Sequence, residues 1–229
     1  QIPLKLDLKE NNTFANFYNG SNTQLVQSLQ QLCSKDSTLA EKYIYLWGNS
    51  QSGRTHLLQA CCHHINKTQA QCFYLSGQQY NLITPAIMEN LEQYKLICID
   101  DINLFLKNRA WEESLFHLFN KIKEHNSNLV ISSQCAPNQL SNQLADLKSR
   151  LCSGLIFKLN QLNDEEKIKA LQQRAYGRGL NLSNEASQYI LHHTPRDLTN
   201  LFKTLNDLDK ASLSQQRKLT IPFIKSIIN

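Results

Sequence analysis

The fold of this 229-residue chain is decided by one stretch, Gly48-Asn49-Ser50-Gln51-Ser52-Gly53-Arg54-Thr55. It follows an apolar, β-favouring run at 43–47 and precedes a segment without Gly or Pro at 56–65. The pattern therefore predicts a buried strand, a Gly-rich loop and a helix. Such a loop offers backbone N–H groups and a helix N-terminus to phosphate oxygens, so the stretch predicts a phosphate-binding loop.

One residue departs from the usual phosphate-loop pattern, because Arg54 stands where Lys is expected. Arg keeps the positive charge but is planar and bulkier, so the exchange is not conservative. The hydroxyl of the next residue, Thr55, is of the kind that serves as a ligand to Mg²⁺. We expect retained nucleotide binding with poor or altered hydrolysis. The alternative is a Gly-rich strand–helix turn without a ligand.

Two carboxylates, Asp100 and Asp101, end the apolar run at 94–101. In open α/β sheets, ligands bind at the carboxyl ends of the strands. We expect Asp100 to hold Mg²⁺ and Asp101 to polarise an attacking water. The alternative is a pair of solvated carboxylates at the end of a strand.

Apolar runs and amphipathic segments alternate up to residue 159, and only helices are predicted after it. Strands are predicted at 43–47, 72–75, 94–101, 129–133 and 155–159. Helices are predicted at 23–33, with Ser21 or Asn22 as cap, and at 56–65, 84–91, 111–125, 144–151, 162–177, 183 onward with Ser183 as cap, 195–213 and 220 onward. Near-continuous apolar strands between helices indicate a parallel sheet covered on both faces. We expect an α/β core at 13–159 and a small all-α domain at 160–229.

The composition predicts a folded globular chain, because 41% of the residues are hydrophobic and 19% are charged. The net charge of +5 comes from scattered basic residues and is weak evidence for a nucleic-acid partner. No apolar run approaches the length of a membrane span.

Seven cysteines, an odd number without a C-x-x-C pair, indicate small buried hydrophobes in a reducing cytoplasm. The stretch Cys61-Cys62-His63-His64 invites comparison with a zinc site, but neighbours on a helix point about 100° apart, so we expect no metal there. The histidines form no triad with a nucleophilic Ser or Cys, which argues against hydrolase-type nucleophilic catalysis.

Residues 1–12 predict an extended tail, because Pro3 disfavours helix and central strand and apolar residues recur along it. Two interpretations stay open from the residues alone. The tail covers the chain's own core, or it is a short linear motif for the apolar groove of a partner.

The order of these motifs resembles AAA+ proteins, and more narrowly the DnaA/Hda family of bacterial replication initiators and their regulators. The resemblance extends over essentially the whole chain. It rests on the phosphate loop, Asp100-Asp101, a strand ending in Ser133-Gln134, Leu147-Lys148-Ser149-Arg150, Pro195-Arg196-Asp197, the leader at 13–22, and the stretches 43–48, 53–58, 98–102 and 216–223.

The resemblance implies roles for residues that composition and spacing leave open. Arg150 is similar to the arginine finger, offered in trans to the nucleotide of a neighbouring initiator, and Arg196 to sensor 2 of the lid. Gln134 falls at sensor 1, where the initiator has an acidic residue. Together with Arg54, this departure implies weak ATP hydrolysis by the chain itself. The implied clamp-binding motif consists of Gln1, Ile2, Leu4 and Leu6.

The implied function is that of the family's short regulators, which lack the initiator's DNA-binding domain. Bound to the sliding clamp on DNA, the beta subunit of DNA polymerase III, they stimulate hydrolysis of DnaA-bound ATP and prevent re-initiation of replication. The implied cofactor is ADP or another nucleoside diphosphate with Mg²⁺, at the junction of core and lid, and self-association is expected to depend on nucleotide. The implied nucleotide-binding residues are Gly48, Gly53, Arg54, Thr55, His56, Asp100, Asp101, Gln134 and Arg196.

Two other functions remain to be compared. One is an autonomous AAA+ ATPase, such as a helicase loader or a short initiator. Arg54 argues against it. The other is a P-loop kinase or transport ATPase, against which the all-α lid and the separate Lys148-Ser149-Arg150 argue.

Overall fold

The computed structural model describes residues 8, 12–34, 41–125, 127–141 and 144–228. The chain forms two compact units, the first comprising Gln1–Phe14 and Asn22–Gln161 and the second Ala15–Ser21 and Leu162–Asn229. Ala15–Ser21 thus belong to the same compact unit as the C-terminal helices, whereas the sequence predicts them in the α/β core. The expected clamp motif, Gln1, Ile2, Leu4 and Leu6, lies outside the described residues.

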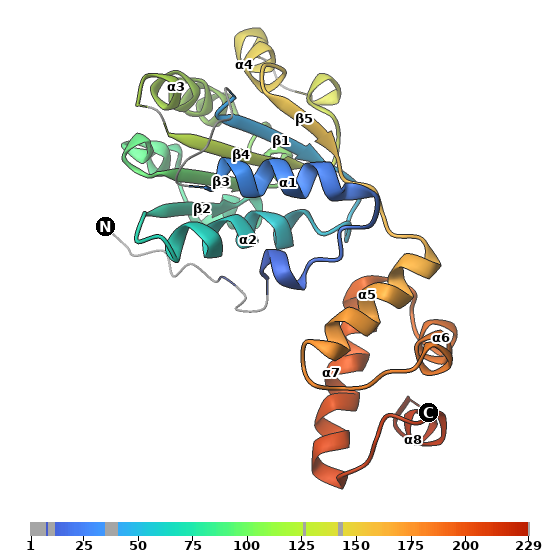
Figure 1. The fold of residues 1–229 in the computed structure, drawn as a ribbon. Coiled ribbons are helices and arrows are strands. Elements are labelled where there is room, and N and C mark those ends of the chain that lie inside the picture. The colour runs from blue at the N-terminus through green and yellow to red at the C-terminus, as the bar shows by residue number, and fades with distance from the viewer. Residues whose placement is uncertain (1–7, 9–11, 35–40, 126, 142–143, 229) are drawn as a thin grey trace. The chain divides into compact units, whose positions relative to one another are not determined.

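The first unit contains a five-stranded, all-parallel sheet with the strand order β2-β3-β4-β1-β5 (Figure 1). The three central strands are almost wholly buried, which explains their continuous apolar sequences. The strands are β1 (Tyr43–Trp47), β2 (Cys72–Ser76), β3 (Leu96–Asp100), β4 (Asn128–Ser133) and β5 (Leu155–Lys158). The predicted fold class is confirmed.

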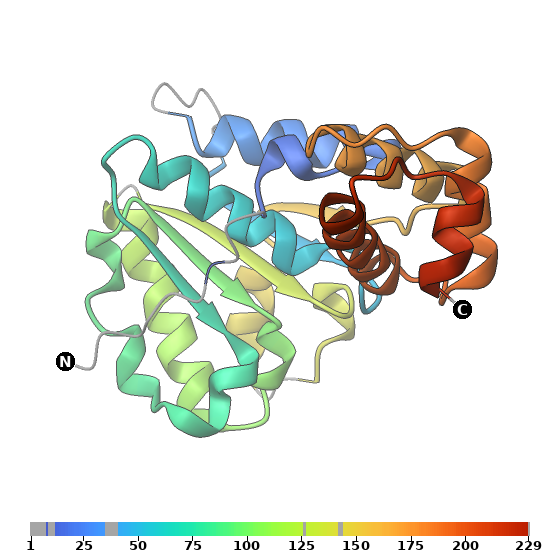
Figure 2. The ribbon, with the colours of Figure 1, turned by 90° about the horizontal axis from the view of Figure 1, so that it is seen from below.

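Helices cover both faces of this sheet (Figures 1 and 2). On one face lie α1 (Thr23–Leu32) and α2 (Arg54–Asn66), and on the other lie α3 (Arg109–His125) and α4 (Ala145–Leu151). The apolar side of α3 packs into the core with alternate residues of the strands. Each crossover helix therefore returns the chain to the edge at which the strands begin. All five strands then end at the opposite edge, called the carboxyl edge below.

Two local predictions were wrong. The helix expected at 84–91 is instead a pair of 3-10 turns, Pro85–Met88 and Leu91–Gln93, because Asn90 between them adopts the left-handed conformation with φ 59°. Asn22 precedes α1 at the cap position, but its side chain does not bond the helix. It bonds both the N–H and the carbonyl of Asn160, after β5.

The second unit is all-α in its described residues, as the sequence predicts. Its helices are α5 (Asp164–Tyr176), α6 (Asn184–His193), α7 (Leu198–Gln215) and α8 (Ile221–Ile228). Side chains cap three of them: Asn163 in a capping box with Glu166, Ser183 as predicted, and Asp197. Its core includes Leu171, Ile190, Leu201, Leu205 and Phe223.

No helix in the described ranges combines the length and apolar character that crossing a membrane requires.

Candidate phosphate-binding site

The Gly-rich loop joins the carboxyl end of β1 to the start of α2. Gly53, the residue before the helix, has φ 101°, a conformation that side chains rarely tolerate. A Cβ added to Gly48 would lie 2.7 Å from the carbonyl oxygen of Leu159. The glycines are therefore required by the loop's conformation and by its close approach to the backbone after β5.

Two polar atoms at this loop suit an anionic ligand. The Oγ atom of Ser52 and the Nη1 atom of Arg54 are buried and have no hydrogen-bond partner among the described residues. A Cβ on Gly48 would lie 3.0 Å from that Oγ atom, so the hydroxyl lies against the backbone of the loop. A buried hydroxyl without a partner and a guanidinium at a helix N-terminus fit a phosphate group, which supplies acceptor oxygens.

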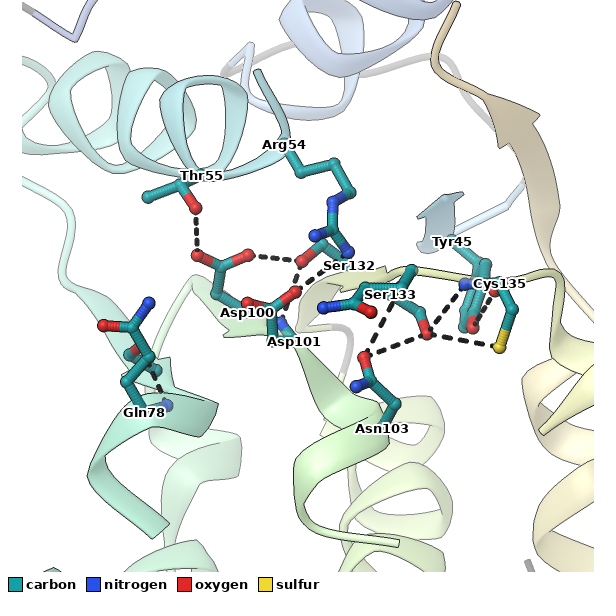
Figure 3. A network of polar contacts seen from close by, with 12 residues as sticks. Tyr45, Arg54, Thr55, Gln78, Asp100, Asp101, Asn103, Ser132, Ser133 and Cys135 are labelled. Atoms are coloured by element: carbon teal, nitrogen blue, oxygen red, sulfur yellow. Dashed lines mark hydrogen bonds and ion pairs between the residues drawn. The ribbon is translucent and has the colours of Figure 1, made fainter. Parts of the chain in front are cut away.

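Asp100, at the end of β3, accepts hydrogen bonds from three hydroxyl groups, of which those of Thr55 and Ser132 are visible in Figure 3. Thr55 donates to its Oδ2 at 2.6 Å and Tyr74 to the same atom at 2.9 Å, while Ser132 donates to Oδ1. Burial, and then the nearby Asp100 carboxylate, raise the pKa of Tyr74, so the phenol remains a donor. The hydroxyl of Thr55 and this carboxylate together offer oxygen ligands of the type that Mg²⁺ binds.

Arg54 faces Asp101 across the same edge of the sheet (Figure 3), with Nη1 at 2.8 Å from Oδ1. The side chains are 8% and 16% exposed, so the pair is largely withdrawn from water. Burial and the adjacent Asp100 charge raise the pKa of Asp101, whereas Arg54 opposes that rise. The structure thus brings the loop and both predicted carboxylates together.

The end of β4 supplies a further polar cluster near the carboxylates. The Oδ1 atom of Asn103 accepts from the hydroxyl of Ser133 at 3.3 Å and from the backbone N–H of Gln134 at 3.4 Å (Figure 3). Gln134 itself is exposed. Tyr74, Ser132 and Asn103 were not predicted from the sequence, because only the pairing of β2, β3 and β4 brings them to Asp100 and Gln134.

The side chain of His56 is turned to another part of the chain. Its Nε2 atom lies 2.9 Å from the carbonyl oxygen of Thr13 and therefore donates to it. The contact joins α2 to Thr13, near the N-terminal end of the same unit.

Arg150 lies at the opposite edge of the sheet from the phosphate loop. It is the penultimate residue of α4, which precedes β5. Leu155 at the start of β5 pairs with Ile44 at the start of β1, and the hydroxyl of Tyr43 donates to the carbonyl of Leu151. The loop follows the other end of β1, which has five residues and is therefore about 16 Å long.

Arg196 belongs to the second unit, where it immediately precedes the N-cap of α7. Its Nη1 atom lies 3.4 Å from Oδ2 of Asp164, and both side chains are about half exposed. An exposed pair of this kind contributes little to stability.

Three cysteines that the sequence separates come together between α2 and the sheet. The sulfurs of Cys62, Cys72 and Cys98 all lie within 4.8 Å of one another, and all three residues are buried. The sulfurs of Cys62 and Cys72 lie 3.0 Å apart. Hydrogen bonding with Cys62, and then with Cys98, lowers the pKa of Cys72 to about 6. The sequence analysis predicted buried thiols but not this convergence.

Comparison with known proteins agrees with this geometry. The model of the bacterial DnaA ATPase domain matches residues 8–158, and the model of the Hda lid domain matches residues 164–228. An uncharacterised protein of Haemophilus influenzae is 42% identical over 100% of this chain and 98% of its own length.

Solved structures show the same fold. Domain III of the replication initiation protein DnaA from Thermotoga maritima has a TM-score of 0.77 at 20% identity, covering 97% of this chain and 99% of that one. AMPPCP-bound DnaA from Aquifex aeolicus has a TM-score of 0.70 at 20% identity, covering 87% and 65%. The two family models together span the core and the lid. The Gly-rich loop and the carboxylate pair lie where such proteins are expected to have them. The chain therefore belongs to the DnaA/Hda family of AAA+ proteins.

Proposed function

We propose that this chain is a regulator that inactivates the replication initiator DnaA by promoting hydrolysis of DnaA-bound ATP. The observation that carries the proposal is the position of Arg150. Its side chain is shorter than the strand that separates its edge of the sheet from the chain's own phosphate loop. Within one molecule it therefore cannot serve the nucleotide of that loop, but it suits the nucleotide of a neighbouring molecule.

The guanidinium of Arg150 is available for that purpose. No described residue forms a hydrogen bond or ion pair with its side chain, and the residue is only partly buried. An arginine inserted beside a transferring phosphoryl group stabilises the charge that develops in the transition state. Here the phosphoryl group would be the γ-phosphate held by DnaA, so the chemistry occurs in the partner.

The chain's own site is proposed to hold a nucleoside diphosphate such as ADP, with Mg²⁺ near Thr55 and Asp100. The support is the requirement for Gly48 and Gly53, together with the unpaired hydroxyl of Ser52 and the guanidinium of Arg54, whose contact with Asp101 is not an aligned hydrogen bond. A fold neighbour from Aquifex aeolicus has AMPPCP bound. The nucleotide would supply phosphate oxygens to these donors, and the lid arginine, Arg196, is proposed to contact it as sensor 2. Exposed Gln134 at the sensor 1 position is consistent with weak turnover.

The proposed second partner is the sliding clamp, the beta subunit of DNA polymerase III, bound through Gln1, Ile2, Leu4 and Leu6. This proposal rests on the resemblance of the tail to a clamp-binding motif, in which apolar side chains enter a partner's groove. DNA would be contacted mainly through the clamp. All seven cysteines are free thiols, which fits a reducing cytoplasm as the place of this activity.

Reconstitution tests the proposal. Radiolabelled ATP is bound to DnaA, and its hydrolysis is followed with this chain and with clamp loaded on DNA, together and separately. We expect rapid hydrolysis only when all are present. A version in which Gln1 and Leu4 are replaced by Ala should lose clamp binding on a sizing column and lose stimulation, while keeping its circular dichroism spectrum.

The same assay separates the alternative of an autonomous AAA+ ATPase. Robust hydrolysis by this chain alone, unaffected by DnaA, would contradict the proposal. So would full stimulation of DnaA in the absence of the clamp, since the tail would then have no part in it.

A further inference from the structure

The basic residue of the phosphate loop already has an anionic neighbour within the protein. Arg54 and Asp101 lie 2.8 Å apart and are both largely buried (Figure 3). In the usual phosphate loop the basic residue is available to the phosphates. Here a carboxylate of the same chain occupies the space beside that charge.

The backbone fixes the position of Asp101. The residue adopts φ 54° and ψ 53°, a conformation uncommon for anything but glycine, and its N–H donates to the hydroxyl of Ser132 at 2.9 Å. Ser132 in turn donates to Asp100. The backbone of Asp101 is therefore held in place by groups other than Arg54, so the residue would stay beside the phosphate loop if Arg54 turned to a ligand.

The pair is close but incompletely bonded. The Nη1 atom of Arg54 and the Oδ1 atom of Asp101 lie in contact, yet neither makes an aligned hydrogen bond with a described residue. A buried ion pair is strongly favourable only when its geometry and its other hydrogen bonds are good. Phosphate oxygens can offer the guanidinium aligned, charge-assisted bonds instead.

We propose that Asp101 competes with the bound nucleotide's phosphate for the guanidinium of Arg54 and thereby sets how fast the nucleotide dissociates. The inference rests on the proposed nucleotide binding and adds a positioning residue to it. Asp101 acts on the ligand through Arg54, so removing its charge strengthens the hold of Arg54 on phosphate.

The experiment measures dissociation of a fluorescent N-methylanthraniloyl ADP by stopped flow, with excess unlabelled ADP as the chase. Asp101→Asn keeps the shape and removes the charge, and Asp101→Glu keeps the charge. We expect dissociation to slow about tenfold or more in Asp101→Asn, since close buried charge pairs couple by at least that factor. The Asp101→Glu variant should release the nucleotide at a rate within about threefold of the wild type.

A double-mutant cycle distinguishes competition for Arg54 from simple repulsion of phosphate by Asp101. In an Arg54→Gln background, Asp101→Asn should change the dissociation rate less than about twofold, because the group through which it acts is absent. An undiminished tenfold effect in that background would overturn the inference. Asp146→Asn, an exposed acid on α4, is the matched control and should behave as the wild type.

The outcomes separate the two proposals. No binding of the ADP analogue by the wild-type chain would overturn both the nucleotide assignment and this inference. Tight binding by the wild type with an unchanged or faster rate in Asp101→Asn overturns the inference alone. Equal melting temperatures of the variants show that the rates compare folded proteins.

Discussion

The charged side chains at the two edges of the sheet differ in whether they have partners within the chain. At the carboxyl edge, Arg54 contacts Asp101, and Asp100 accepts bonds from three hydroxyls. At the amino edge, the guanidinium of Arg150 has no partner among the described residues. Both edges belong to the same five strands.

This difference indicates what each edge is suited to do. A buried arginine that already contacts a carboxylate exchanges this internal partner for a ligand only at a cost. An arginine without an internal partner breaks no bond when it meets phosphate on another molecule, so more of its interaction energy is available there. The carboxyl edge suits a ligand whose release depends on an internal competitor, and the amino edge suits action on a partner.

The largest expected effect is at the amino edge. Replacing Arg150 by Ala should reduce stimulation of DnaA-bound ATP hydrolysis by about 10³-fold or more, the scale reported for arginine fingers. Thermal stability and binding of ADP should stay unchanged, because this side chain pairs with no described residue. Single-turnover hydrolysis by DnaA is the measurement.

The matched control is Lys148→Ala, two residues earlier on the same helix. It should retain at least about half of the stimulation if position, and not general positive charge, matters. Equal losses in the two variants would mean that the amino edge acts as a diffuse basic patch.

The second-largest effect is expected when the hydrogen-bond acceptor at the carboxyl edge is removed. Asp100→Ala leaves the hydroxyls of Thr55, Tyr74 and Ser132 without their acceptor, in a site where Asp100 is 2% exposed. We expect the free energy of unfolding to fall by about 3 kcal/mol. Urea unfolding measures it, with exposed Asp146→Ala as control, and a loss equal to that of the control would contradict the described network.

A steric change at Gly48 tests the packing of the phosphate loop at the same edge of the sheet. Gly48→Ala would place its Cβ 2.7 Å from the carbonyl oxygen of Leu159, so the loop must shift, and we expect a loss of about 2 kcal/mol together with weaker ADP binding. Gly177→Ala is the matched control. Its Cβ would meet nothing closer than 3.6 Å, and its φ is −61°, so stability should hold or rise slightly.

The smallest expected effect removes one hydroxyl from the network. Tyr74→Phe deletes the 2.9 Å bond to Asp100 and leaves the ring, and we expect a loss of about 1.5 kcal/mol. Tyr176→Phe, at a side chain that is 84% exposed, should change stability by less than about 0.5 kcal/mol. Thermal unfolding of both variants, compared at one pH, reports the difference.

Local patterns were enough to predict the strands, the Gly-rich loop between a strand and a helix, and the place of the two carboxylates at the end of β3. They could not predict that Tyr74 and Ser132 meet at Asp100, because that depends on β2 and β4 being the neighbours of β3. The convergence of Cys62 with Cys72 and Cys98 depends on the same strand order. The helix expected at 84–91 failed for a local reason, since apolar spacing does not reveal the left-handed backbone of Asn90.

The membership of Ala15–Ser21 in the second unit has a consequence for how this chain is made. Ala15 is synthesised long before Gln173, whose side-chain amide donates to the carbonyl of Ala15 and which lies more than 150 residues later in the chain. Contacts of such sequence separation form slowly, and segments that wait for them are exposed to misfolding. A cut at the family-model boundary near residue 164 would therefore yield a helical fragment without its N-terminal segment, whereas a fusion of residues 15–21 to that fragment should fold more stably.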